Sequence, residues 1–113
     1  LDAIVGCRVP AEPDEAETAL VLAANETLQR ILSLDVPSGI NPDSGEPERF
    51  CVRATATLAL GLPKKGLYNP AARRFVGDLY LADCGIPPAA FESAGVSPEP
   101  WFRRGEVLQI RLP

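Results

Sequence analysis

The fold is decided by one short stretch of the chain, Ile31-Leu32-Ser33-Leu34-Asp35-Val36-Pro37-Ser38-Gly39-Ile40. Its first four residues are uncharged and mostly apolar, which is typical of a strand covered on both faces in a parallel sheet. Asp35 closes this run, and Pro37 ends the strand because proline has no backbone N–H to donate. Open α/β sheets bind ligands at the carboxyl ends of their strands. Asp35 is therefore a candidate site residue, and the alternative is an aspartate that only caps the following turn.

Composition excludes several classes of function. The chain has 113 residues, a formal net charge of −4 and an isoelectric point near 4.8, which argues against a nucleic-acid-binding surface built on net basicity. It contains no histidine, so Ser–His and Cys–His nucleophiles cannot be assembled within it. No apolar run approaches the ~20 residues of a membrane span, and no signal-peptide pattern opens the chain. We expect one small domain or part of one, with neither nucleic acid nor membrane as a partner.

The three cysteines, Cys7, Cys51 and Cys84, are odd in number and lack the CxxC spacing of a zinc ribbon. We interpret them as free thiols of a reducing compartment, cytoplasmic or alternatively mitochondrial. The chain also has no methionine, and residues 1–6 resemble the carboxyl end of a strand that runs into a glycine turn. These features are expected of a fragment, a processed product or one half of a split protein.

The spacing of apolar residues predicts alternating helices and strands. An amphipathic helix is predicted from residue 14 to about residue 30, joining the strand end at 1–6 to the strand at 31–36 as a parallel crossover. The apolar residues expected on its buried stripe are Ala16, Leu20, Ala23, Ala24, Leu28 and Ile31. Further strands are predicted at 52–62, 75–83 and 106–112, the last as a half-exposed edge. A helical turn is predicted at 69–74 and a short helix at 88–94.

Six groups of residues share their order with a known family. They are Asp2-Ala3-Ile4-Val5-Gly6, Leu34-Asp35-Val36-Pro37-Ser38-Gly39, Asp43-Ser44-Gly45-Glu46, Val52-Arg53-Ala54-Thr55-Ala56-Thr57-Leu58, Gly61-Leu62-Pro63-Lys64-Lys65-Gly66-Leu67, and Gly77-Asp78-Leu79-Tyr80 with Ala82-Asp83-Cys84-Gly85-Ile86-Pro87. In this register the chain resembles the NAD(P)H-hydrate epimerase family, the YjeF N-terminal domain.

The resemblance covers the carboxyl-terminal half of that domain. The family's amino-terminal half carries an Asn- and Gly-rich nucleotide loop, Asn-Asn-Gly-Gly-Asp-Gly, which is absent from this sequence. The resemblance implies a Rossmann-like three-layer αβα sandwich with a mostly parallel sheet. Residues 1–113 would form the carboxyl-terminal half of this α/β domain.

The resemblance also implies an activity. Members of the family interconvert the R and S epimers of hydrated NADH and NADPH, and the S epimer is the substrate of an ADP- or ATP-dependent dehydratase, fused or separate. The catalytic residue that it implies is Asp35, and the residues that it implies for a potassium ion are Asp2 and Ser38. The substrate-binding residues that it implies are Gly6, Cys7, Arg8, Val9 and Asp35. We therefore expect an isomerase of nicotinamide nucleotide repair, inactive without its amino-terminal half.

Elementary chemistry agrees with these implied roles. Inversion of a ring carbon that bears a hydroxyl requires the C–O bond to loosen and to re-form on the other face, and a carboxyl group can give and take back the proton. Carboxylate and hydroxyl oxygens suit a hard cation such as potassium. Asp2 and Asp35 each follow a predicted strand, and neighbouring strand ends share one crevice.

The loop after Asp2 departs from the family pattern. The family has Gly-Thr-Gly-Leu there, whereas this chain has Gly6-Cys7-Arg8-Val9-Pro10. Arg8 replaces a glycine, so it either contacts a phosphate itself or marks a loop that no longer binds one. The alternative function is therefore a non-catalytic nucleotide-binding or dimerising scaffold module on the same fold.

Two other pairs of residues have two interpretations each. Lys64 and Lys65 follow a predicted strand and are either anion contacts or charged guards of a sheet edge. Trp101 and Phe102 are either a stacking platform or packing for the tail of the chain. Because half of a doubly wound sheet leaves a strand edge unpaired, we also expect pairing with a complementary amino-terminal half or self-association as a homo-oligomer.

Overall fold

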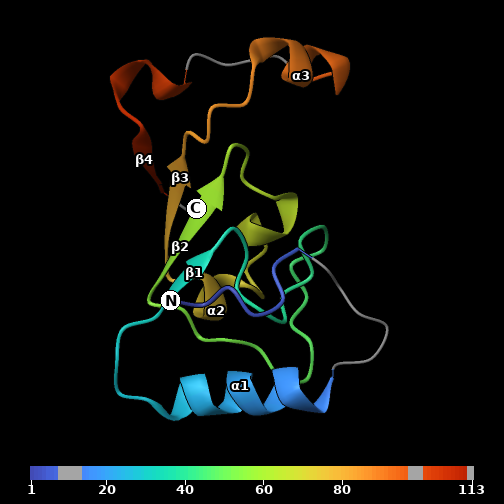
Figure 1. Cartoon of the computed structure of the whole chain (residues 1–113), viewed down its shortest axis with the longest axis vertical. Helices are drawn as coiled ribbons and strands as arrows, with labels where there is room; N and C mark the ends of the chain where they lie inside the picture. Colours follow the sequence, from blue (N-terminus) through green and yellow to red (C-terminus); the bar gives the residue numbers. More distant parts are fainter. Residues whose placement is uncertain (8–13, 97–100, 112–113) are drawn as a thin grey trace.

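The computed structural model describes residues 1–7, 14–96 and 101–111. A four-stranded sheet runs through the molecule in the order β1 (Leu32–Leu34), β2 (Ala56–Leu60), β3 (Asp78–Ala82) and β4 (Val107–Ile110) (Figure 1). The pairs β1–β2 and β2–β3 are parallel, and β4 pairs antiparallel with β3. This mostly parallel sheet with its helices confirms the predicted α/β, Rossmann-like class.

The first residues of the chain extend the sheet at the β1 edge. Asp2 forms an isolated parallel bridge with Ser33. The Asp2 N–H donates to Leu32 O at 2.8 Å, and the Leu34 N–H donates to Asp2 O at 2.9 Å. Helix α1 (Glu15–Glu26) lies in the sequence between this bridge and β1. The predicted strand–helix–strand order with parallel strands is therefore confirmed.

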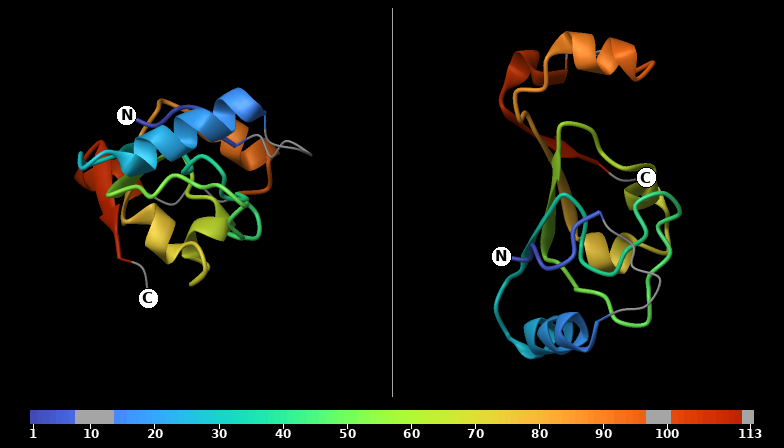
Figure 2. Two further views of the ribbon diagram at one scale, coloured as in Figure 1. Left: turned by 90° about the horizontal axis from the view of Figure 1, so that it is seen from below. Right: turned by 45° about the vertical axis from the view of Figure 1, so that its right-hand side comes forward.

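The predicted buried stripe of α1 is wrong. Val21 is the buried residue of this helix, whereas the side chain of Leu20 is 57% exposed and Leu28, beyond the end of the helix, is fully exposed. The helix begins at Asp14, whose carboxylate accepts the Ala16 N–H at 3.1 Å. Figures 1 and 2 show α1 beyond the amino-terminal ends of the strands, at the opposite end of the molecule from α3 (Pro88–Ser93).

A hydrogen-bonded asparagine explains which side of α1 faces inward. The Asn25 side-chain N–H₂ donates to Cys51 O at 2.7 Å, and its side-chain oxygen accepts the Arg53 N–H at 2.8 Å. Asn25 and Val21 are four residues apart, so both lie on the same face of the helix. The polar anchor and Val21 together decide the orientation, and the leucine stripe is left outside.

Two predicted strands are shorter than their patterns suggested, and one predicted helical turn is displaced. The strand predicted at 52–62 begins only at Ala56. The strand predicted at 75–83 begins at Asp78, because residues 75–76 complete α2 (Arg73–Val76). Gly77 makes the change from helix to strand at φ +62°, where a Cβ atom would lie 2.2 Å from Thr55 O. The helical turn predicted at 69–74 is replaced by η1 (Lys65–Tyr68) and α2.

The core is formed mainly by the sheet, the turn after β1, η1 and α2. Its buried residues are Val36, Ile40, Cys51, Ala59, Leu67, Ala72, Phe75, Val76, Leu79 and Leu81. Phe102, in η2 (Trp101–Arg104), and Ile110 pack against this cluster, which agrees with the packing interpretation for Phe102. The side chain of Trp101 lies outside what the structure describes. Across the described residues, we find no helix with the length and apolarity to span a membrane.

Candidate functional site

Asp35 has an unusual backbone conformation at the end of β1. Its φ is +66°, the one positive value outside glycine among the described residues. The Val36 N–H donates to Leu34 O at 2.8 Å, so a tight γ-turn centres on Asp35. Aspartate and asparagine tolerate positive φ better than other residues with a Cβ atom. Backbone held in such conformations is concentrated at functional sites.

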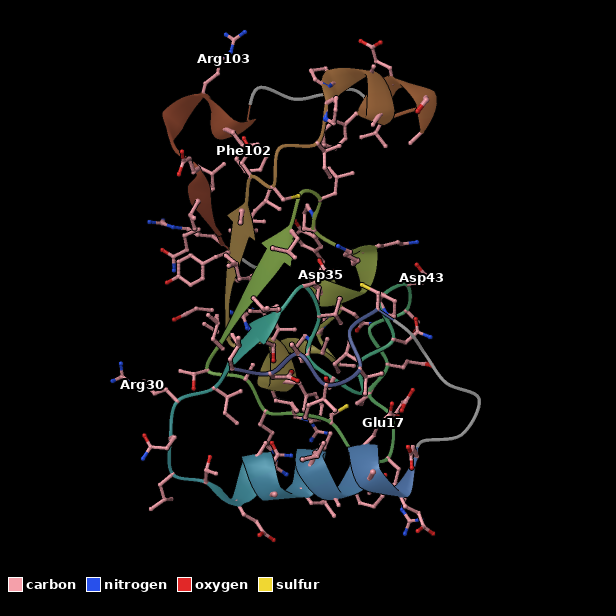
Figure 3. All side chains as sticks on the ribbon, viewed as in Figure 1. Glu17, Arg30, Asp35, Asp43, Phe102 and Arg103 are labelled. Carbon is pink, nitrogen blue, oxygen red and sulfur yellow. The ribbon has the colours of Figure 1, made fainter. Side chains whose placement is uncertain are left out.

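The carboxylate of Asp35 is held by three donors from two other segments. Its Oδ1 accepts the Leu60 N–H at 3.1 Å and also a hydrogen bond from the Lys64 ammonium. Its Oδ2 accepts a hydrogen bond from the Cys7 thiol, with 2.8 Å between the sulfur and the oxygen. The side chain remains 20% exposed. Figure 3 shows Asp35 just past the end of β1.

These contacts decide the protonation of the carboxyl group. Partial burial alone raises the pKa of Asp35, but the hydrogen bonds from Cys7, Lys64 and Leu60 and the charge of Lys64 together lower it below its ordinary value. Asp35 is therefore ionised at neutral pH, when it can accept a proton or stabilise a positive charge.

The same contact affects Cys7. Partial desolvation of the thiol, although the residue as a whole is exposed, together with the hydrogen bond to Asp35 and the negative charge of Asp35, raises the pKa of the Cys7 thiol to about 11. At neutral pH the sulfur is protonated and serves as a hydrogen-bond donor, and a thiolate nucleophile is not formed there.

Asp2 belongs to a second, buried group of polar side chains. Its side chain is withdrawn from solvent, with 3% of the residue exposed, and Ser33 and Ser38 are fully buried. The Asp2 Oδ2 accepts the Ser33 hydroxyl at 2.5 Å and the Ser38 N–H at 3.0 Å. The Asp2 Oδ1 accepts the Ser38 hydroxyl at 2.7 Å and the Ile4 N–H at 3.3 Å. An ionised carboxylate has about four acceptor positions, so these four donors satisfy it.

Ser38 connects this group to the start of the chain. Its hydroxyl donates to Asp2 and accepts the Val5 N–H at 3.0 Å, and its carbonyl accepts the Val52 N–H at 2.9 Å. The next residue, Gly39, has φ +92°, and a Cβ atom there would lie 2.2 Å from Phe50 O. The turn after β1 is therefore packed tightly against residues 1–5 on one side and 50–52 on the other.

The Asp2–Ser38 pair has the ligand chemistry of a site for a hard cation. Carboxylate and hydroxyl oxygens lie 2.7 Å apart, and one acceptor position remains on the Ser38 hydroxyl after its two hydrogen bonds. A cation that bound Asp2 directly would have to displace a hydroxyl or N–H donor. Within the described residues there is no cluster of three or more His, Cys, Asp or Glu that could hold a metal ion.

The predicted substrate loop is described only in part. Gly6 has φ +65° and open space around the position of a Cβ atom, and Cys7 is exposed and contacts Asp35. Arg8 and Val9 lie outside the described residues. The structure thus brings Cys7 to Asp35 and Asp2 to Ser38. Gly6 lies between Asp2 and Cys7 in the sequence.

Sequence reasoning missed Ser33 and did not foresee the partner of Lys64. Ser33 is the one hydroxyl in the otherwise apolar run 31–34, and a buried hydroxyl requires a partner, which was the available signal. Lys64 was weighed as an anion contact, and the anion that it contacts in the structure is Asp35. Lys65 is exposed.

The fold and these side chains define an α/β domain with an ionised, partly open carboxylate at the carboxyl ends of parallel strands, where such sheets bind ligands. Residues 1–66 match the family model described as YjeF-related protein N-terminus. The chain belongs to this family, as the resemblance predicted.

Curated relatives carry more specific names. The chain is 44% identical over 107 residues to the NAD(P)H-hydrate epimerase of Truepera radiovictrix, a match that covers 91% of this chain and 47% of that protein. It is 42% identical over 96 residues to the NAD(P)H-hydrate epimerase of Dehalogenimonas lykanthroporepellens, covering 85% and 38%. It is 37% identical over 93 residues to the bifunctional NAD(P)H-hydrate repair enzyme Nnr of Coxiella burnetii, covering 82% and 19%. The chain thus spans less than half the length of these relatives.

Proposed function

We propose that residues 1–113 are the carboxyl-terminal half of an NAD(P)H-hydrate epimerase domain, an isomerase of nicotinamide nucleotide repair, with Asp35 as the catalytic carboxylate. The observation that carries the proposal is the Asp35 carboxylate, kept ionised at the carboxyl end of β1 and still 20% exposed. The family match and the names of the relatives support the same activity. The proposed substrates are the R and S epimers of hydrated NADH and NADPH.

The reaction requires a group that transfers one proton and stabilises one positive charge. The hydroxyl of the substrate takes up a proton and leaves as water, so the ring carbon becomes cationic. Water then adds to the opposite face and releases a proton, which completes the inversion with atoms and charge in balance. The Asp35 carboxylate stabilises the cation and accepts the released proton, and as a carboxylic acid it supplies the proton for the next hydroxyl that leaves.

The remaining predicted residues have supporting roles in this proposal. The loop of Gly6, Cys7, Arg8 and Val9 borders the substrate, and the contact of Cys7 with the Asp35 carboxylate supports that placement. Asp2 and Ser38 would hold a potassium ion. The ion's charge there would help to orient the substrate and Asp35, and the oxygen chemistry of the pair supports this role.

The partners that we propose follow from the length and names of the relatives. The chain acts together with the amino-terminal half of the family's domain, from the same polypeptide or from a complementary chain. The bifunctional relative in Coxiella burnetii supports a fused or separate ADP- or ATP-dependent dehydratase as a partner in the repair of the nucleotide. The free thiols of Cys7, Cys51 and Cys84 support a reducing compartment, the cytoplasm or alternatively the mitochondrion.

The decisive experiment replaces Asp35 in the complete protein. Asp35→Asn keeps the size of the side chain and its tolerance of positive φ, so the γ-turn is retained while the proton acceptor is lost. Chromatography of the R and S hydrates measures the rate of epimerisation, which should fall by ~10²–10⁴-fold. The matched control is Asp83→Asn, an exposed aspartate just past the end of the parallel strand β3, which β2 separates from β1, and this variant should keep near wild-type activity. Equal rates for Asp35→Asn and wild type would exclude this role for Asp35.

One observation favours a second function. Both oxygens of Asp35 already have partners within the chain, as expected of a non-catalytic nucleotide-binding or dimerising module in which the carboxylate is structural. Thermal shift of the complete protein with NADP in potassium or tetramethylammonium buffer distinguishes the cases. Stabilisation by NADP without epimerisation would support the module, and epimerisation with stabilisation that depends on potassium would support the enzyme.

A further inference from the structure

The two oxygens of the Asp35 carboxylate have donors of very different strength. Oδ1 accepts from a full positive charge on Lys64 and from the backbone N–H of Leu60. Oδ2 accepts from the Cys7 thiol alone among the described donors, and S–H is a weak donor. Charge-assisted hydrogen bonds are roughly twice as strong as neutral ones. Oδ1 is therefore the oxygen that keeps its partners, and Oδ2 is the oxygen that can exchange its partner.

Hydrogen bonds and close packing hold the backbone next to Lys64 in place. The Lys64 carbonyl accepts the N–H of Leu67, a fully buried residue of η1, at 3.1 Å. The Gly66 N–H donates to Pro42 O at 2.8 Å, and a Cβ atom on Gly66 would lie 2.5 Å from the backbone nitrogen of Gly45. The backbone that follows Lys64 is thus held within η1 and against residues 42–45. The Lys64 side chain is 26% exposed and forms the ion pair with Asp35.

We infer that Lys64 is a positioning residue that locks Asp35 Oδ1 and thereby makes Oδ2, on the side of the Cys7 loop, the reactive oxygen. This inference rests on the proposed epimerase function. It gives the loop of Gly6 and Cys7 a specific part, because the substrate replaces the Cys7 thiol at Oδ2. It also excludes Lys64 as a direct contact for the phosphates of the substrate.

The groups that face the carboxylate come from two segments. The Leu60 N–H belongs to the last residue of β2, Lys64 follows that strand, and Cys7 belongs to the segment after Asp2. Asp43, on the loop drawn near Asp35 in Figure 3, acts on Cys7 through its negative charge. Lys64 is the one cation among these described groups. Its removal therefore raises the pKa of Asp35, and the acid limb of the rate profile moves to higher pH.

The test compares Lys64→Met with Lys65→Met, a neighbouring lysine that is exposed, in the complete protein. Lys64→Arg serves as the conservative variant. The Asp35 carboxyl is titrated by ¹³C NMR, and kcat and KM for the R and S hydrates are measured between pH 4 and pH 9. We expect Lys64→Met to raise the Asp35 titration midpoint, to move the acid limb of kcat in the same direction, and to lower kcat about tenfold or more with little change in KM. Lys65→Met should leave both midpoints in place, and Lys64→Arg should restore part of kcat.

The other outcomes separate failure of the inference from failure of the proposed function. An active enzyme in which Lys64→Met raises KM alone would show that Lys64 contacts the substrate, which overturns the inference. So would a lower melting temperature with the Asp35 midpoint unchanged, because Lys64 would then be only structural. A wild-type protein that does not epimerise, yet shows the shift of the Asp35 midpoint in Lys64→Met, would overturn the proposed function while supporting the locked carboxylate.

Discussion

The Cys7 thiol donates a hydrogen bond of 2.8 Å to Asp35 Oδ2 across 28 residues of sequence. This bond joins the segment that follows the Asp2 bridge to the end of β1. It couples the titration of the two groups, because the donor keeps its proton more firmly while the acceptor loses its proton more easily. A substrate that binds at Oδ2 has to break this hydrogen bond, so substitutions at Cys7 or Asp35 test the site directly.

The coupling predicts the reactivity of Cys7. Asp35 raises the pKa of the Cys7 thiol, so Asp35→Asn should lower that pKa below about 11 and speed the reaction of Cys7 with iodoacetamide at pH 8 to 9. Cys51 is an internal control, because burial is the main cause that raises the pKa of its thiol to about 11 and Asp35 is not among the causes. Alkylation rates of each cysteine are measured by peptide mass spectrometry. An unchanged rate at Cys7 would contradict the coupling.

Ser38 is predicted to stabilise the fold through Asp2. Ser38→Ala removes a charge-assisted hydrogen bond to Asp2 and leaves the Val5 N–H without its acceptor, so it should lower the free energy of unfolding by ~1.5–3 kcal/mol in urea titrations. Ser93→Ala is the control, because that hydroxyl is exposed at the end of α3 and its loss should cost less than ~0.5 kcal/mol. Equal effects for the two variants would show that the buried group contributes little.

Gly39 is predicted to be irreplaceable for a reason that Gly85 does not share. Both have positive φ, +92° and +73°, so alanine at either position costs ~1–2 kcal/mol of backbone strain. At Gly39 the new Cβ atom also lies 2.2 Å from Phe50 O, whereas at Gly85 there is open space within 4 Å. Gly39→Ala should therefore lower the free energy of unfolding by a further ~1–3 kcal/mol. Chemical denaturation of both variants measures the difference, and similar losses would rule out the clash.

The chain is predicted to associate in isolation. Leu1, Leu20 and Leu28 are 82%, 57% and 102% exposed, and the β1 edge is covered by a single bridge at Asp2. Light scattering of residues 1–113 should show oligomers whose mass rises with concentration. Leu20→Glu should reduce the mass of these oligomers. Addition of the amino-terminal half of the domain should replace them with one defined complex. A monodisperse monomer at all concentrations would contradict this prediction.

Sequence patterns predicted the order of helices and strands better than the length of these elements or the face that each one buries. The period of apolar residues predicted a helix from residue 14 to about residue 30, observed at 15–26, and all four strands of the described sheet, because backbone geometry imposes those periods locally. The same periods misplaced the buried face of α1, where Asn25 and Val21 face inward and Leu20 does not. Which face of a helix is buried depends on the surface that it meets, and residues 51–53, which bond Asn25, are part of that surface.

For the candidate site, too, the sequence indicated individual residues, and only the tertiary structure showed their contacts. Asp35 was identified from its own stretch, since an acid at the end of a buried parallel strand lies where such sheets bind ligands, whereas the role of Ser38 was implied by the family resemblance. The donors that give Asp35 its lowered pKa come from Cys7, 28 residues before it, and from Lys64, 29 residues after it. Their meeting depends on the parallel register of β1 with β2 and on the position of η1, which no local pattern contains. Local chemistry thus chose the carboxylate, and the long-range packing of strand ends decided its charge and its partners.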